Sequence, residues 1–285
     1  MRRDIFRIIS WGGIGDALLL TPALRALKAE QPDRKVAVFY PKKSHEEVLR
    51  HNPNIDILKT ANPLACPFEA FSYYFGLKPF HLVNYGQYSP SRFARVHAAE
   101  IIARMLGVKL DGAHMEVFLT SQERDRAAAH FVYRTRTIAL HTGANCSSNK
   151  NWPEQNWSSL VRRNPQFRFL QLGAADDPNA EGAVDLRGRT TLREAFAILA
   201  CSDCFVGIES SLAHAASALK IPGIVIFGPT TPQVWGNSNL TNLYKRAPCS
   251  PCIDVLFSDP CPYERYCMTD ITVVEVENTL YRLFK

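Results

Sequence analysis

The sequence predicts an α/β protein with parallel sheets. Runs of β-branched and aromatic residues, such as 5–10 and 35–40, alternate with stretches whose apolar residues recur at helical spacing. The alternation breaks near 121–136 and restarts at 137–143. The 285 residues, 46% of them hydrophobic, suffice for two cores. Strands that alternate with helices pair in parallel, so the two series predict two Rossmann-like domains that face a central cleft.

The first domain is expected to span residues 1–134. Its predicted strands are rich in β-branched or aromatic residues and lie at 5–10, 35–40, 55–58, 81–85 and 115–119. Helices are expected directly after the first strand, where leucines recur at helical spacing, and near 91–106. Ser44 and Glu47 have the spacing of a capping box and predict a further short helix.

The second domain is expected to span residues 135–285. Its predicted strands lie at 137–143, 167–173, 204–210 and 223–228. Helices are expected to begin at Pro153, Thr191 and Ser211. Apolar residues recur at helical spacing over 272–285, which predicts a closing helix docked on this domain.

Residues 68–93 interrupt this rhythm with many aromatic side chains and scattered proline and glycine. These aromatics either pack in the core and its loops, or form a wall that stacks on sugars or faces a membrane. The sequence leaves both interpretations open.

The net charge of +6 suits an anionic ligand or an acidic lipid surface. The basic residues are scattered along the chain, so a nucleic-acid partner is not expected. No stretch has the roughly 18 consecutive apolar residues of a membrane span, and residues 1–10 lack the apolar core of a signal peptide. We therefore expect a cytoplasmic protein, with peripheral contact at the inner membrane face left open.

Glycines separate the first predicted strand from the helix that follows. Gly12, Gly13 and Gly15 permit a tight turn, and the N–H groups of a helix start attract anions, so Gly13 and Gly15 are candidate binding residues. A dinucleotide fingerprint would need glycine where Leu18 stands, which argues against a nicotinamide cofactor. Asp16 is either a plain helix cap or a carboxylate that takes a proton from an incoming hydroxyl.

A second polar group follows two strands of the second domain. Glu209 ends a strand, and Ser210 and Ser211 open a helix of small residues. Such a helix start suits a diphosphate, and His214, one turn further on, either donates to it or packs in the core. Thr230 adds a polar turn at the same strand ends, where open α/β sheets bind ligands.

Lys150 stands in a small-residue loop just before the helix expected at Pro153. It is either a point charge for phosphate or a solvated surface lysine. The sequence has no D-x-D pair to hold Mg²⁺ at a diphosphate. No cofactor is therefore expected for catalysis, and protein cations and helix ends would stabilise the phosphates.

Four segments, in this order and spacing, resemble glycosyltransferase family 9, the ADP-heptose heptosyltransferases of GT-B fold. They are residues 12–28, 149–157, 207–219 and 224–232. The resemblance covers nearly the whole chain. It implies that Asp16 is the catalytic base and that Lys150 binds the donor phosphate. It also implies that Asp176 contacts the donor ribose, with a slip by one residue to Asp177 left open.

The family motif D-[TS]-G-x-x-H corresponds to residues 209–214 with two departures. Glu209 replaces the aspartate, so the sugar hydroxyls that it would hold must sit differently. Ser211 replaces the glycine and has less backbone freedom. Ser210 and His214 match the motif.

The function implied by the resemblance is transfer of a heptose from ADP-heptose to a hydroxyl acceptor, with inversion at the anomeric carbon. The first domain would hold the acceptor and the second the nucleotide sugar. The expected acceptor is a lipopolysaccharide core or a related glycan, free or lipid-linked. Transfer to a protein serine or threonine is one alternative, and an inactive nucleotide-sugar-binding protein is the other.

Four cysteines gather in the segment 249–267, which is rich in proline, serine and aspartate. They are Cys249, Cys252, Cys261 and Cys267. Four thiolates at such spacing can close a structural site around zinc or iron, although a set of free thiols is the alternative. Disulfides are not expected in a cytoplasmic protein.

Overall fold

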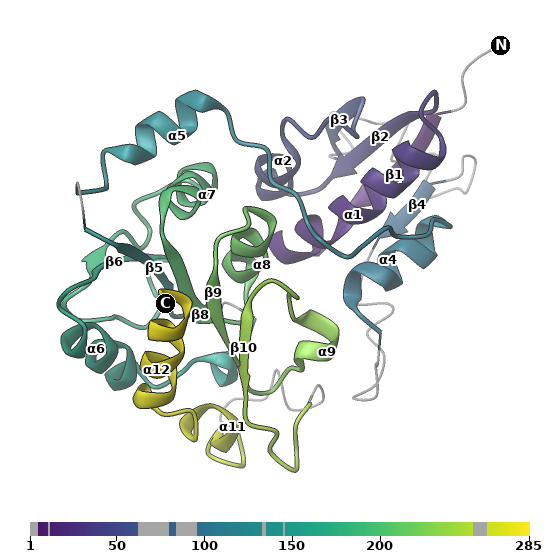
Figure 1. The fold of residues 1–285 in the computed structure, drawn as a ribbon. Helices are drawn as coiled ribbons and strands as arrows, with labels where there is room; N and C mark the ends of the chain where they lie inside the picture. Colours follow the sequence, from purple (N-terminus) through teal and green to yellow (C-terminus); the bar gives the residue numbers. More distant parts are fainter. Residues whose placement is uncertain are drawn as a thin grey trace. The chain divides into compact units, whose positions relative to one another are not determined.

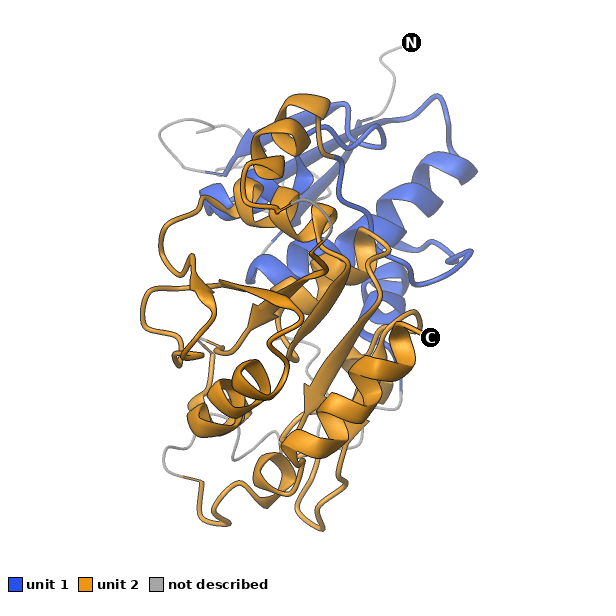
Figure 2. Ribbon diagram, turned by 60° about the vertical axis from the view of Figure 1, so that its left-hand side comes forward, with its two compact units in different colours: residues 1–89, 96–118 blue, residues 90–95, 119–285 orange. Residues whose placement is uncertain are grey.

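The computed structural model describes residues 5–10, 12–61, 80–83, 96–132, 135–144, 146–252 and 261–285. The chain divides into two compact units (Figure 2). Unit 1 comprises residues 1–89 and 96–118, and unit 2 comprises residues 90–95 and 119–285. Apart from the strand at 80–83, the aromatic segment 68–93 lies outside the described residues, so both interpretations of it stay open.

Unit 1 is built on one parallel sheet with the strand order β3-β2-β1-β4 (Figure 1). Its strands are β1 Ile5–Ser10, β2 Lys35–Tyr40, β3 Ile57–Thr60 and β4 Phe80–Val83. Its helices are α1 Ile14–Glu30, α2 Lys43–Leu49 and α4 Ala98–Leu106. The leucines of α1 are fully buried because this helix packs on β1, α2 and α4 together. The parallel sheet predicted for the first domain is confirmed.

Two local predictions in unit 1 are wrong. Residues 115–119 form no strand, because the Glu116 N–H donates to the Thr21 hydroxyl of α1 at 2.9 Å instead of joining the sheet. Helix α2 begins at Lys43 after the N-cap residue Lys42, and no side chain caps it, so Ser44 is not its cap.

Unit 2 is also built on a parallel sheet, in the order β10-β9-β8-β5-β6-β7. Its strands are β5 Thr137–His141, β6 Arg168–Leu172, β7 Val184–Asp185, β8 Cys204–Ile208, β9 Gly223–Phe227 and β10 Thr241–Tyr244. Numbered from β5, the order reads 3-2-1-4-5-6, which is that of a doubly wound nucleotide-binding sheet. The short strands β7 and β10 were not predicted, and the other four are confirmed.

The helices of unit 2 precede, connect and follow these strands. They are α5 Ser121–Ala128, the 3₁₀ turn η2 Ser148–Lys150, α6 Glu154–Arg163, α7 Leu192–Cys201, α8 Ser211–Ala218, α9 Pro232–Trp235, α11 Tyr266–Thr269 and α12 Val273–Leu283. Helix α12 packs on α6 and β9 and buries Val276 and Leu280 fully. Burial of each such side chain adds about 1.5–3 kcal/mol to the stability of the folded state. The predicted closing helix is confirmed.

Helix α5 belongs to unit 2, although it precedes residue 134, where the sequence predicted the domain boundary. Arg193 of α7 donates to both carboxylate oxygens of Glu123 in α5, at 2.7 and 2.6 Å. The chain therefore passes from one unit to the other before α5. The assignment of acceptor binding to the first domain and of donor binding to the second stays a prediction.

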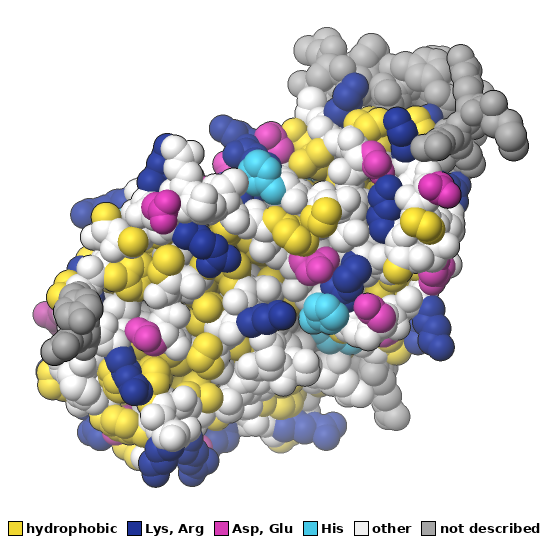
Figure 3. Space-filling model, turned by 45° about the horizontal axis from the view of Figure 1, so that its top comes forward, with side chains coloured by type: hydrophobic (Ala, Val, Ile, Leu, Met, Phe, Trp, Pro, Cys, Tyr) yellow, Lys and Arg dark blue, Asp and Glu magenta, His cyan; other side chains and the backbone are white. Residues whose placement is uncertain are grey.

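The surface carries charges of both signs. Figure 3 shows Lys and Arg side chains interspersed with Asp and Glu on the face that it presents. Within the described part of the chain, no helix combines the length and hydropathy needed to cross a bilayer.

Candidate active site

The polar groups of unit 2 meet where its strand order reverses. Strands β5 and β8 are neighbours there, and both are parallel, so their carboxyl ends lie at the same edge of the sheet. His141 ends β5, while Glu209 and Ser210 directly follow β8. The crevice at such a switch point is where open α/β sheets bind their ligands.

Lys150 and Glu209 form an ion pair at this edge, and each side chain is 8% exposed. The hydroxyl of Thr230 donates to the same carboxylate oxygen at 2.9 Å. Burial disfavours both charges, but the attraction between them outweighs it, so the pKa of Glu209 is lowered and the pKa of Lys150 is raised. Lys150 is therefore a buried, paired cation and not a solvated lysine.

His214 lies one turn into α8 and is 3% exposed. Its Nδ1 atom lies 3.4 Å from Asn237 Oδ1, and its interaction with Glu209 also helps to lower the pKa of that carboxyl. Ser210 is the N-cap residue of α8, and its hydroxyl accepts from the Ala213 N–H at 3.4 Å. The structure thus brings His214, Glu209 and the start of α8 together, as the sequence predicted.

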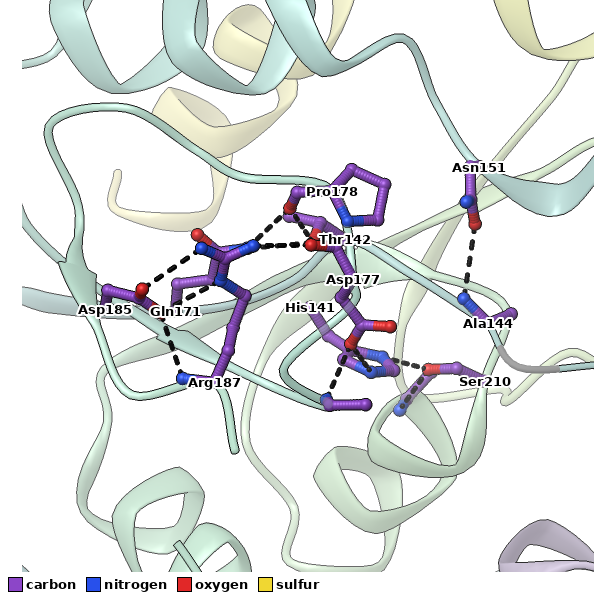
Figure 4. Close-up of polar contacts among 12 residues, drawn as sticks. His141, Thr142, Ala144, Asn151, Gln171, Asp177, Pro178, Asp185, Arg187 and Ser210 are labelled. Carbon is purple, nitrogen blue, oxygen red and sulfur yellow. Dashed lines mark hydrogen bonds and ion pairs between the residues drawn. The ribbon is translucent and has the colours of Figure 1, made fainter. Parts of the chain in front are cut away.

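His141 joins two of the predicted site residues, and the sequence analysis did not identify it (Figure 4). Its Nδ1 atom lies 2.8 Å from Ser210 Oγ, and its Nε2 atom lies 3.4 Å from Asp177 Oδ2. All three residues are buried. The signal for His141 was its position, since it is the polar last residue of the first strand of a Rossmann-like unit.

Of the two neighbouring aspartates, the structure brings Asp177 to this network. Asp177 is 6% exposed, and its carboxylate accepts from the Ala174 N–H at 2.9 Å, whereas Asp176 is exposed. A Cβ atom on Gly143 or Gly173 would overlap an oxygen of the Asp177 carboxylate, so a larger residue at either position would displace that carboxylate. Of the two aspartates that the sequence left open, Asp177 is therefore the one whose carboxylate contacts His141.

Polar side chains hold the loop that carries Asp177 by hydrogen bonds to its backbone carbonyls. Gln171 donates to the Pro178 carbonyl at 2.7 Å, and Thr142 donates to the same carbonyl at 2.6 Å. The Arg187 side chain donates to the Asp177 carbonyl and forms two hydrogen bonds with Asp185, whose pKa it lowers to about 2. These contacts fix the direction of the Asp177 carboxylate.

In unit 1, the glycine turn surrounds Asp16. Gly13 is the N-cap residue of α1, and Asp16 lies in its first turn. The Asp16 carboxylate reaches back to accept from the Gly13 N–H at 2.6 Å. Gly12 has φ +114°, and a Cβ atom there would lie 2.5 Å from Asp16 Oδ2. Asp16 is therefore not the N-cap residue, and Gly12 must be glycine for the turn to hold this carboxylate.

The remaining predicted residues are distributed as follows. Gly15 lies in the first turn of α1, and Ser211 is the first residue of α8. Thr230 follows β9 and is buried. Gly13 and Gly15 are in unit 1, whereas Ser211 and Thr230 are in unit 2.

The four C-terminal cysteines lie close enough to influence one another. Burial and the neighbouring thiols raise the pKa of Cys252 to about 11 and that of Cys267 to about 12. Among the described residues, which exclude 253–260, no group of three or more His, Cys, Asp or Glu is arranged to hold a metal. The sulfur donors suit zinc or iron, but their described positions do not close around one. The structural metal stays a prediction.

The sequence model of glycosyltransferase family 9 (heptosyltransferase) matches residues 91–261. The chain belongs to this family. Lipopolysaccharide heptosyltransferase 1 of Salmonella typhimurium is 31% identical over 138 residues, which cover 44% of this family 9 chain and 43% of that protein. The enzyme of the same name from Pseudomonas aeruginosa is 30% identical over 116 residues, 36% of this chain and 33% of that protein. The alignments thus span less than half the length of these relatives.

Solved structures show that this family 9 chain has the GT-B fold. E. coli ADP-heptose lps heptosyltransferase II superposes with a TM-score of 0.75 over 98% of both chains, at 16% identity. The iron-containing dodecameric glycosyltransferase TibC of enterotoxigenic E. coli superposes with a TM-score of 0.74 over 99% of this chain and 76% of its own, also at 16% identity. The fold class predicted from the sequence is confirmed.

Proposed function

We propose that this family 9 protein is an inverting heptosyltransferase that moves a heptose from ADP-heptose to a hydroxyl acceptor. The observation that carries the proposal is the buried Lys150–Glu209 pair beside the start of α8, at the switch point of a nucleotide-binding sheet. The names of the relatives support it, since they are lipopolysaccharide heptosyltransferases. One solved structure of similar fold is described as a heptosyltransferase in complex with ADP-D-β-D-heptose.

Unit 2 would bind the donor. Lys150 has three N–H donors, so it can keep Glu209 and still bind a phosphate oxygen. Together with His214 and the N–H groups at the start of α8, it would stabilise the charge that develops on the departing diphosphate. Asp177, held by His141, would accept a hydrogen bond from the ribose. No metal is required in this scheme, because protein cations and a helix start supply the positive charge.

Unit 1 would supply the base. The acceptor oxygen forms a bond to the anomeric carbon on the face opposite the diphosphate, while the bond from that carbon to the phosphate oxygen breaks. The acceptor proton passes to the Asp16 carboxylate, and the bonding electrons leave with ADP. A single displacement of this kind inverts the anomeric carbon. The helix start favours the ionised form of Asp16, which is the form that can take a proton.

The proposed acceptor is a lipopolysaccharide core or a related glycan. The net charge of +6 suits a phosphorylated, membrane-held acceptor, and we place the reaction at the cytoplasmic face of the inner membrane. On the face shown in Figure 3, Lys and Arg side chains are interspersed with Asp and Glu, which does not favour a nucleic-acid partner.

The proposal is tested by incubating the protein with ADP-heptose and heptose-deficient lipopolysaccharide core. We expect ADP release and a core one heptose heavier by mass spectrometry, with UDP- and GDP-sugars failing to replace the donor. Transfer only to a protein substrate would show that the acceptor is wrong. Tight ADP-heptose binding without transfer to either acceptor would show an inactive binding protein instead.

A further inference from the structure

The turn before α1 depends on one peptide unit, which joins Gly12 to Gly13. Its N–H group, on Gly13, donates to Asp16 Oδ2 at 2.6 Å. Its carbonyl oxygen, on Gly12, lies 3.2 Å from His45 Nε2. Because a peptide unit is planar, the orientation of the carbonyl fixes the orientation of the N–H group. A single rigid plane thus connects His45 to the proposed base.

This peptide has little steric restraint of its own. It lies between two glycines, which accept many backbone conformations and let a peptide rotate at small cost. Gly12 has φ +114°, and the Asp16 carboxylate occupies the space that the Cβ atom of a larger residue would need. The direction of the Gly13 N–H must therefore be set by hydrogen bonds.

His45 is suited to set that direction. Its side chain is fully buried, and burial lowers its pKa against the opposing effect of the backbone contacts, which favours the neutral ring. Its Nδ1 atom lies 3.2 Å from Ser10 Oγ and 3.1 Å from the Ser10 carbonyl oxygen. In the tautomer with the proton on Nε2, the Ser10 hydroxyl donates to Nδ1 and the ring donates to the Gly12 carbonyl, 3.2 Å away.

Lys42 contacts the same carbonyl from the surface. Its ammonium group donates to the Gly12 oxygen at 3.3 Å. Its side chain is exposed, so it gives up hydration and conformational freedom to make this contact and holds the peptide less firmly than the buried ring does. Donation to a carbonyl also polarises the N–H group at the other end of the peptide and strengthens its bond to Asp16.

We propose that His45 is a positioning residue for Asp16, which holds the Gly12–Gly13 peptide so that its N–H group fixes the carboxylate. The inference rests on the proposed role of Asp16 as the base. His45 acts through the peptide and does not contact the substrate. A misplacement of a reacting group by about 1 Å can cost on the order of 10²-fold in rate, so the hold on this carboxylate matters.

The inference is tested with His45→Ala and His45→Gln in protein labelled with ¹⁵N-glycine. Gln keeps an N–H donor, whereas Ala removes it. We expect the Gly13 amide proton of His45→Ala to move upfield, toward its position in Asp16→Ala, and that of His45→Gln to stay near the wild-type position. With ADP-heptose and heptose-deficient core, His45→Ala should lose about 10- to 100-fold in kcat at unchanged ADP affinity. His45→Gln should recover most of this loss.

Val48→Ala is the matched control, because Val48 is 1% exposed on the same helix and its side chain carries no hydrogen-bond donor. It should lower the melting temperature and leave the Gly13 amide and kcat unchanged. A folded His45→Ala protein with a wild-type Gly13 amide and wild-type kcat overturns the inference. Should His45→Ala fail to fold, His45→Leu, which fills the buried site but carries no donor, replaces it in the same two measurements.

The two proposals fail in distinguishable ways. Wild-type turnover in Asp16→Asn would remove Asp16 as the base. The Gly13 amide would still report whether His45 orients the peptide, because that signal does not depend on transfer.

Discussion

Lys150 and Glu209 come from different segments of unit 2 and form a buried ion pair, with each side chain 8% exposed. The replacement of either partner leaves the other charge buried without compensation. Glu209→Gln and Lys150→Met should each lower the free energy of unfolding by about 3–5 kcal/mol. The double variant should lose less than the sum of the two. Urea unfolding of the four proteins measures this coupling, and additive losses would contradict it.

The pH dependence of this pair follows from the two shifts. Because the pKa of Glu209 is lowered in the folded protein, this carboxylate stabilises the fold fully above its unfolded-state pKa of 4.5. The stabilisation is lost as the pH falls through the folded-state pKa. Because the pKa of Lys150 is raised in the folded protein, this ammonium group stabilises the fold fully below its unfolded-state pKa of 10.5. The stabilisation is lost as the pH rises through the folded-state pKa. The pair is therefore intact at neutral pH.

Asp16→Asn tests the proposed base. Asparagine is nearly the same size and can still accept from Gly13, but it cannot take the acceptor proton. We expect kcat to fall by about 10²- to 10⁴-fold while the Kd for ADP, measured by calorimetry, stays at its wild-type value. Unchanged turnover would contradict the assignment.

Asp177 and Asp176 form a matched pair of test sites. Asp177→Asn should weaken ADP binding by about 10-fold, because a charged acceptor for the ribose is lost. Asp176→Asn should leave the Kd for ADP unchanged, since Asp176 is exposed and Asp177 contacts His141. The reverse result would move the proposed ribose contact to Asp176.

Arg193 and Glu123 fix α5 on unit 2, and their contact predicts an acid response. Arg193 lowers the pKa of Glu123 from 4.5 to about 2, so the contribution of this carboxylate is present above pH 4.5 and lost as the pH falls toward 2. Arg193→Met should therefore cost about 2–3 kcal/mol at pH 7 and much less at pH 2.5. Equal losses at both pH values, from urea unfolding, would rule out this pair as the cause.

The cysteine segment 249–267 is tested by metal analysis. If the four thiols hold zinc or iron, as the sequence predicts, purified protein should contain about one metal per chain, and Cys249→Ser should lose it. Cys201→Ser is the control, since Cys201 belongs to α7 and not to this segment. Metal-free wild-type protein, prepared without chelators, would favour a set of free thiols.

The local patterns of the chain predicted most of the fold. Strands β1, β2, β5, β6, β8 and β9 were recognisable because strands buried in a parallel sheet read as continuous apolar runs. Strand β7 has only two residues, too few for a period to show. The segment 115–119 has the composition of a strand, but its backbone hydrogen bond goes to Thr21, a partner that no local pattern indicates.

The candidate site was only partly readable from the sequence. Glu209 and Ser210 follow the end of β8, and His214 lies in the first turn of α8, so the proximity of these residues follows from local geometry. His141 and His45 escaped notice because neither belongs to a local motif. His141 gains its place from contacts with Ser210 and Asp177, which are distant in the sequence.

The sequence by itself determined the alternation of strands and helices, the glycine turn before α1 and the order of the family 9 segments. These depend on the side chains of neighbouring residues, whose spacing along the chain fixes their geometry. Only the tertiary structure decided that Lys150 is buried against Glu209, that Asp177 and not Asp176 meets His141, and that His45 bonds the Gly12 carbonyl. Such contacts form because a folded core removes water from distant polar groups, which must then pair with one another.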